Sequence, residues 1–308
     1  MGIRLVVAVT DREWFDHLRR LSRLNEVNFW APSPTPFKAL SQGELFLFKL
    51  HAPDNFIVGG GVFTYANVLP CSLAWEAFGE ANGAASLRDM RARIIRYRRN
   101  ELQSRGDFQI GCRILTQPFF IEREAWVELP PSWSRNIVTF KTYSTDDSDG
   151  KYLWDSIQER IAGIFADRQL GEIEQARYGE PTLVRPRLGQ GAFRILVTDN
   201  YHRRCAVTGE RTLPALDAAH IRPYADGGLH TVSNGLLLRR DIHSLFDAGY
   251  VTITPDYRFD VSKRIKEEFE NGRDYYVLKN RLVRIPDSSD SRPDPLALDW
   301  HNNERFLG

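Results

Sequence analysis

The chain has 308 residues, of which 42% are hydrophobic, 12% aromatic and 26% charged, and its formal net charge is +1. This composition excludes a disordered chain, and the lack of an apolar run of roughly 18 residues argues against a membrane-spanning helix. The small net charge excludes a strong global attraction to nucleic acid, so any DNA contact has to come from local basic patches.

The N-terminal segment predicts a mainly β domain with helical insertions. Residues 3–9 are rich in β-branched side chains and predict a buried strand, and a helix is expected to follow as far as about Leu24. Further strands are predicted at 43–50 and 55–69. The triple glycine at 59–61 lies inside the last of these strands, which predicts a bulge or a close approach of another backbone segment.

The segment 86–100 is the most basic part of the chain and predicts a helix. Its apolar residues Leu87, Met90 and Ile94 recur at helical spacing, and arginines occupy the other faces. Arginine forks match phosphate oxygens, so Arg96 and Arg99 are candidate DNA phosphate contacts. A solvated helix face paired with nearby carboxylates explains the same pattern equally well.

The middle of the chain predicts a domain boundary. Two strands are expected in 108–129 around Pro118, and the acidic stretch 144–151 predicts a surface loop. A connecting helix and a proline-containing linker follow. We therefore expect a first domain at 1–145, a helical linker at 146–189 and a second domain at 190–308.

Cysteine usage is typical of an intracellular protein. Cys71, Cys112 and Cys205 are far apart and form no CxxC pair, so we expect neither a disulfide framework nor a structural zinc site. The N-terminal apolar run LVVAV is short and acidic residues follow it at once. We therefore expect no signal peptide, no membrane partner and a cytoplasmic protein.

Residues 217–249 place polar side chains in an otherwise apolar stretch. ALDAAHI predicts a strand, HTVSNGLLL a returning strand, and DIHSLFDAG a helix with Asp241 as N-cap and Gly249 as stop. His220, Asn234 and His243 follow one another at spacings of 14 and 9 positions. Strand, loop, strand and helix within this stretch predict a compact hairpin closed by a helix.

These residue types fit phosphodiester hydrolysis. Histidine titrates near neutral pH, so His220 can act as the general base, and His243 can bind a divalent cation. Asp247 lies four residues after His243 on the same helix face, where it can bind the cation or orient the ring. The amide of Asn234 can hold the loop through backbone hydrogen bonds.

The pattern AHI, NGLLL and DIHSLFDAG resembles the HNH endonucleases of the ββα-metal class over about residues 190–260. The resemblance implies that His220 is the general base, Asn234 the loop-stabilising residue and His243 a metal ligand. It also implies one divalent cation, Mg²⁺ or Mn²⁺, as cofactor. Many such enzymes carry a metal-binding residue directly before the catalytic histidine, where this chain has Ala219. We expect Asp217 or Asp247 to take that role.

Arginines beside this motif are candidate phosphate contacts, with simple solvation as the alternative. They are Arg222, Arg239 and Arg240. His230 and His301 belong to no such pattern, and we expect both on the surface.

The N-terminal segments EVNFWAPS, FKAL, GELFLFKL and IVGGGVF resemble proteins in which an HNH domain follows a β-barrel of the PUA, EVE and ASCH type. The SRA domains that read methylated cytosine use a related barrel. This resemblance implies an α+β protein whose barrel holds a pocket for a flipped, modified base, because aromatic stacking offsets the cost of flipping. Trp30 and Phe37 flank a proline-rich loop and are the first pocket candidates, and Phe119 and Trp126 are the second.

Together these features predict a modification-dependent restriction endonuclease that binds double-stranded DNA and acts as a homodimer, since one site per chain cuts one strand. Two alternatives remain open. One is an HNH nuclease that acts on unmodified nucleic acid, and the other is a non-catalytic reader with a decayed HNH fold.

Overall fold

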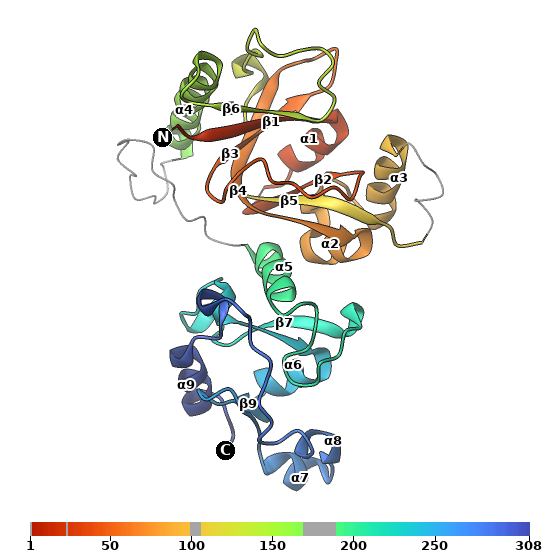
Figure 1. Ribbon diagram of the computed structural model, residues 1–308, viewed down its shortest axis with the longest axis vertical. Helices are drawn as coiled ribbons and strands as arrows, with labels where there is room; N and C mark the ends of the chain where they lie inside the picture. The colour runs from red at the N-terminus through yellow and green to blue at the C-terminus, as the bar shows by residue number, and fades with distance from the viewer. Residues whose placement is uncertain (1, 23, 99–105, 169–188) are drawn as a thin grey trace. The chain divides into compact units, whose positions relative to one another are not determined.

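The computed structural model describes residues 2–22, 24–98, 106–168 and 189–308, and it divides into two compact units at residues 1–187 and 188–308 (Figure 1). Each unit has its own hydrophobic core. No helix in these ranges is long and apolar enough to cross a membrane.

The first unit is built on one mixed sheet flanked by helices. Its strands are β1 (Arg4–Thr10), β2 (Glu26–Ala31), β3 (Leu45–Leu50), β4 (Ile57–Pro70), β5 (Gln109–Phe120) and β6 (Phe140–Ser144). Its helices are α1 (Arg12–Arg19), α2 (Cys71–Phe78), α3 (Leu87–Tyr97) and α4 (Ser148–Arg168). The strand order is β2-β5-β4-β3-β1-β6, with β1 and β3 parallel and the other described pairs antiparallel. The fold class α+β is thereby confirmed.

The predicted barrel is corrected to an open sheet. Among the described strands, β2 and β6 are the two ends of the sheet and do not pair with each other. Pro32, Pro34 and Pro36 follow directly after β2 and lack backbone N–H donors. These prolines interrupt regular strand structure directly after β2.

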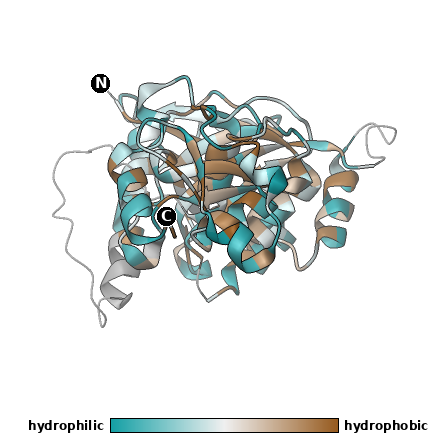
Figure 2. Cartoon of the chain, turned by 90° about the horizontal axis from the view of Figure 1, so that it is seen from below, coloured by the Kyte–Doolittle hydropathy of each residue, from teal (hydrophilic) through white to brown (hydrophobic). Residues whose placement is uncertain are grey.

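Both faces of the sheet are covered, so its central strands are apolar on both sides. Leu5 and Val7 of β1 pack in one cluster with Leu153 and Ile157 of α4. On the opposite face, Phe46 and Phe48 of β3 lie together, and the Trp14 ring of α1 meets the Phe48 ring edge-on at 5.0 Å. Figure 2 shows apolar segments following the strands. The start of α4 thus packs with the first unit.

The glycines of β4 confirm the predicted bulge and close approach. The β3–β4 and β4–β5 pairings both shift register in or near β4. A Cβ added at Gly59 would lie 2.4 Å from the Phe119 carbonyl oxygen, and one at Gly60 would lie 2.7 Å from the Phe46 carbonyl oxygen. The neighbouring backbones leave no room for a side chain at either position.

Two boundaries in the first unit differ from prediction. β5 runs through Pro118 as one strand, because Gln117 adopts a φ of 50° at a register shift and absorbs the proline there. α1 ends at Arg19 rather than near Leu24, because the N–H groups of the next residues bond carbonyls three positions back and tighten the last turn.

The basic segment forms α3 as predicted, with Met90 and Ile94 buried. Arg99 lies outside the described residues.

The second unit combines two hairpins with helices. Its elements are α5 (Gln190–Asn200), β7 (Leu216–His220), β8 (Gly235–Arg239), α6 (Arg240–Asp247), β9 (Val251–Ile253), β10 (Phe259–Val261), α7 (Arg264–Phe269), α8 (Arg273–Tyr276) and α9 (Pro295–Glu304). β7 pairs antiparallel with β8, and β9 with β10. The predicted hairpin closed by a helix is confirmed.

The helix caps of α6 are partly as predicted. Gly249 follows the helix with a φ of 79°, a conformation that favours glycine and stops the helix. The N-cap is Arg239 rather than Asp241, because the Asp241 carboxylate accepts a two-pronged contact from the Arg239 guanidinium at 2.8 and 2.6 Å.

His301, expected on the surface, is buried at 2% exposure. Its ring stacks on Phe246 at 3.7 Å, and its two nitrogens contact the Thr252 hydroxyl at 2.9 Å and the Phe246 carbonyl oxygen at 3.0 Å. Burial lowers the pKa of His301 to about 4, so this residue is a neutral part of the core.

Candidate active site

The hairpin and α6 bring the three motif residues onto one small framework. His220 is the last residue of β7 and pairs in register with Gly235, the first residue of β8. Asn234 directly precedes Gly235, and its carbonyl oxygen accepts a hydrogen bond from the Ile221 N–H at 2.9 Å. His243 lies on α6, which starts where β8 ends.

Asn234 closes the loop between the two strands. Its side chain is buried, its Oδ1 accepts from the Arg222 N–H at 2.9 Å, and its Nδ2 donates to the carbonyl oxygens of Arg222 and Leu229 at 2.8 and 2.9 Å. Gly228 lies beneath this amide, and a Cβ there would lie 1.8 Å from the Arg222 carbonyl oxygen. The loop therefore has one tightly fixed shape.

The Asn234→Ala variant should lower the free energy of unfolding of the second unit by about 2–4 kcal/mol, because three hydrogen bonds of about 1 kcal/mol each are lost. Chemical denaturation that resolves the transition of this unit measures the change. Asn303→Ala, at an exposed position on α9, is the matched control and should change stability little. Equal stability of the two variants would contradict the closing role of Asn234.

His220 is held between two aromatic rings. The Phe193 ring of α5 stacks on the His220 ring, with 3.9 Å between the ring centroids and 9° between the ring planes. Nε2 of His220 lies 3.0 Å from Nδ1 of His230. Burial, and then the nearby His230 and His243, lower the pKa of His220 to about 4. The ring is therefore neutral at pH 7, the protonation state that a general base requires.

His230 is a site residue that sequence reasoning left on the surface. Its ring meets His220 edge-on at 4.9 Å between centroids and also packs against Phe193. The sequence offered one signal for this role: His230 lies ten residues after His220, in the loop that Asn234 closes. Loop geometry, which the sequence pattern does not show, turns it toward His220.

Carboxylates face both ring nitrogens of His243. Nδ1 lies 3.4 Å from Asp217 Oδ2, and Nε2 lies 3.3 Å from Asp247 Oδ2. Burial favours the neutral ring, but the hydrogen bond with Asp217 and the charge of Asp247 outweigh it and raise the pKa of His243. The two carboxylates thus lie on opposite edges of the ring.

The pKa values of Asp217 and Asp247 are shifted in opposite directions. Burial would raise the pKa of Asp217, but the hydrogen bond with His243 and the charge of Arg194, 3.9 Å away, lower it overall. The pKa of Asp247 is raised, chiefly by burial. Asp217 is therefore the carboxylate held more firmly in its charged form.

The donor set fits a hard divalent cation with few protein ligands. Within the described ranges no group of three His, Cys, Asp or Glu side chains is arranged to hold a metal ion. The Asp217–His243 pair nevertheless offers one carboxylate and one imidazole from adjacent elements. Mg²⁺ commonly binds to one or two carboxylates and completes its shell with water and substrate phosphate, so the pair is compatible with it.

The candidate phosphate-binding arginines make contacts within the chain. Arg222 donates from Nε to the Asp226 carbonyl oxygen at 2.6 Å and lies 5.3 Å over the Trp300 ring. The Arg239 guanidinium donates to the Asp241 carboxylate, and the Arg96 guanidinium donates to both carboxylate oxygens of Glu13 at 3.2 and 2.9 Å. Arg240 also has a partner. Their DNA contacts stay predictions.

Cys205, near the motif, is buried, and its Sγ accepts from the Arg239 N–H at 3.3 Å.

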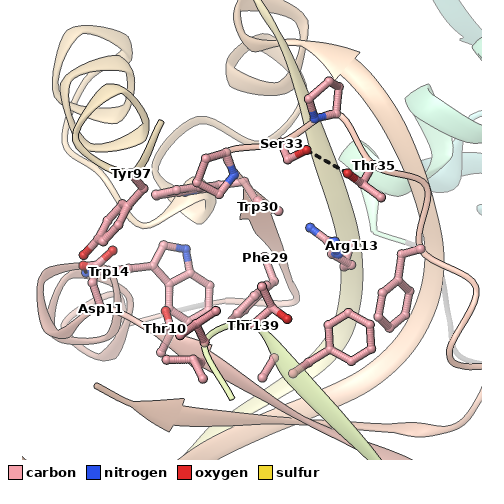
Figure 3. Close-up of a pocket in the computed structure, with 18 of the residues that line it drawn as sticks. Thr10, Asp11, Trp14, Phe29, Trp30, Ser33, Thr35, Tyr97, Arg113 and Thr139 are labelled. Carbon is pink, nitrogen blue, oxygen red and sulfur yellow. Dashed lines mark hydrogen bonds between the residues drawn. The ribbon is translucent and has the colours of Figure 1, made fainter. Parts of the chain in front are cut away.

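The first unit contains a cavity of about 760 Å³ between the ends of β1 and β2 and the proline-rich loop. Figure 3 shows Trp30, Phe29, Trp14 and Tyr97 around it, with Arg113 on one side. Of the four predicted pocket residues, Trp30 and Phe37 line it.

Phe119 and Trp126 lie elsewhere. Phe119 packs against the apolar cluster that α4 forms with β1, and Trp126 Nε1 donates to the Ile121 carbonyl oxygen at 3.1 Å.

Comparison with known proteins places the second unit's motif in a family. A solved structure of a modification-dependent restriction endonuclease, TagI, shows a weak likeness, with 14% identity and a TM-score of 0.30 over 86% of this chain and 62% of that one. The chain thus spans under two thirds of that structure. No curated protein matches. Residues 205–254 match the HNH endonuclease family model, so the stretch that carries His220, Asn234 and His243 is an HNH endonuclease domain.

Proposed function

We propose that the second unit hydrolyses DNA phosphodiester bonds with His220 as general base. The observation that carries this proposal is that one hairpin and its helix hold both a neutral, ring-stacked His220 and the Asp217–His243 pair, with His243 near enough to lower the pKa of His220. A base and a cation-binding pair on one framework are the two requirements of the reaction.

Each side chain has a distinct task in this proposal. His220 accepts the proton of the attacking water on the ring nitrogen that does not face His230. His230 and the stacked Phe193 hold the ring in place. Asn234 keeps the loop in one conformation, so the base stays aligned with the scissile phosphate.

Asp217 and Nδ1 of His243 would hold the cation, Mg²⁺ or Mn²⁺. When bound, it supplies positive charge to the phosphate and leaving oxygen. Asp247 contacts the opposite nitrogen of His243 and orients the ring.

We further propose that the first unit selects the DNA by its modified bases. The aromatic cavity beside the proline-rich loop supports this role, because a flipped base can stack on its walls. An open sheet can provide such a pocket as well as a barrel can. Two copies of the chain would be needed to cut both strands, so we propose a homodimer.

Purified protein with Mg²⁺ or Mn²⁺ should cut phage DNA that carries modified cytosine and leave the same sequence, amplified without modification, intact. Gel electrophoresis of both substrates measures this. Equal cutting of both would remove modification dependence and leave an HNH nuclease for unmodified DNA. DNA binding without cutting under any divalent cation would instead indicate a non-catalytic reader.

A further inference from the structure

Arg113 lies in the wall of the cavity without a charged partner in the described part of the chain. Arg113 on β5 is only 7% exposed and lines the cavity, and Figure 3 shows its guanidinium directed toward the space beside Trp30 and Phe29. Among the described residues it forms no ion pair. Its one hydrogen bond there, from Nη1 to the Gly111 carbonyl oxygen, is 3.4 Å long.

This arrangement leaves most of the donors of Arg113 unused. A guanidinium carries five N–H donors in a fixed fork, and the Phe37 ring, 5.2 Å from its central carbon, interacts with its face rather than with these donors. Burying a charged group with few hydrogen bonds costs free energy. A buried arginine with unused donors is therefore expected where a ligand supplies the missing acceptors.

The other walls restrict the kind of ligand. Trp14 and Trp30 line the cavity, and the Trp14 indole N–H is buried with no hydrogen-bond partner in the described part of the chain. Trp30 Nε1 is already used by the Asn82 carbonyl oxygen at 3.0 Å. The Trp14 N–H is enclosed by protein atoms, so among these groups Arg113 supplies the unused donors. The cavity thus combines aromatic surfaces for a planar ring with the donors of Arg113, which favours acceptor atoms on the ligand.

We propose that Arg113 determines the specificity of this cavity by donating to an oxygen atom on the substituent of a modified base. The inference rests on the proposed base-reading function of the first unit and names the class of base: one that carries hydroxyl, carbonyl or carboxylate oxygen rather than a methyl group alone. A planar fork matches such oxygens, and a carboxylate can accept both prongs.

The test measures binding of the full chain, in EDTA, to five matched duplexes. One is unmodified, and the others carry a single 5-methylcytosine, 5-hydroxymethylcytosine, 5-carboxylcytosine or N6-methyladenine. The wild type should bind at least one oxygen-bearing duplex about tenfold or more tightly than either methylated duplex, the size expected for a charge-assisted hydrogen bond. Arg113→Gln should reduce this ratio toward one without weakening the binding of the methylated duplexes.

Two further variants separate specificity from folding and from general charge. Arg113→Lys keeps the charge but loses the fork, so it should retain the fold, judged by thermal denaturation, and still lose most of the preference. Arg20→Gln removes an exposed arginine at the end of α1 and should keep the full preference. A preference for a methylated duplex, or an equal loss with all duplexes in Arg113→Gln, would overturn the role of Arg113. Failure to distinguish any modified duplex from the unmodified one would overturn the base-reading function itself.

Discussion

Replacing His220 with alanine should lower the rate of DNA cleavage by about 10²–10⁴-fold, the usual contribution of a positioned general base. DNA affinity should stay close to that of the wild type, because the His220 ring is stacked under Phe193 and contacts His230 rather than extending as a charged group. Single-turnover cleavage of a labelled duplex at saturating Mg²⁺ or Mn²⁺, combined with a binding measurement in EDTA, separates the two effects.

His202→Ala is the matched control, since this histidine lies in the same unit but is exposed and pairs with Asp287 at 2.9 Å. Its cleavage rate should equal that of the wild type. His230→Ala should fall between the two, because it removes a contact that orients the base and leaves the base in place. Undiminished cleavage by His220→Ala would exclude this residue from the mechanism.

The hairpin–helix framework of the site could be predicted because its signals are local. Turn residues, the apolar runs and a stop glycine each act within a few positions, and the structure contains the elements they predict. The partners of His243 and His220 depend instead on side-chain directions. Asp217 lies on β7 and His243 on α6, and their distance of 3.4 Å follows from how the helix crosses the hairpin. Single-sequence patterns hold no such information, and for the same reason His230 was missed.

In the first unit, too, local features could be predicted and contacts between distant segments could not. The glycine bulge in β4 and the helix α3 were predicted from local composition. The cavity was predicted only in part, because its walls come from distant segments: Trp14 from α1, Trp30 from β2 and Arg113 from β5. Phe119 follows Pro118 in a strand whose register shift turns it toward the α4 cluster. Aromatic residues near turn signals therefore could not be sorted into cavity and core without the sheet order.

Substitution of the two carboxylates beside His243 distinguishes a metal ligand from a residue that orients the ring. Both lie within 3.4 Å of a ring nitrogen, but they face opposite edges of the ring. Asp217 comes from the strand that also carries His220, and its lowered pKa keeps it charged. Asp247 lies on the same helix as His243, is 58% exposed and has a raised pKa. The lowered pKa of Asp217 favours it as the ligand, whereas an orienting partner needs only to accept the second ring N–H.

Asp217→Asn should therefore lower cleavage by more than about 100-fold at millimolar Mg²⁺ and raise the metal concentration needed for half-maximal activity. Asp247→Asn should cost about 10–100-fold, the range typical of partners that orient a ligand from outside the coordination shell. Titrating each variant with Mg²⁺ and Mn²⁺ and fitting the half-maximal concentration gives the comparison, with Asp256→Asn, an exposed position away from the site, as control. The reverse ranking, with Asp247→Asn the more damaging change, would assign the cation to the Nε2 edge of His243 and leave Asp217 as the orienting group. Both substitutions replace a carboxylate by an amide at nearly equal distance from the His243 ring, so a difference between them reports which edge of the ring the cation occupies.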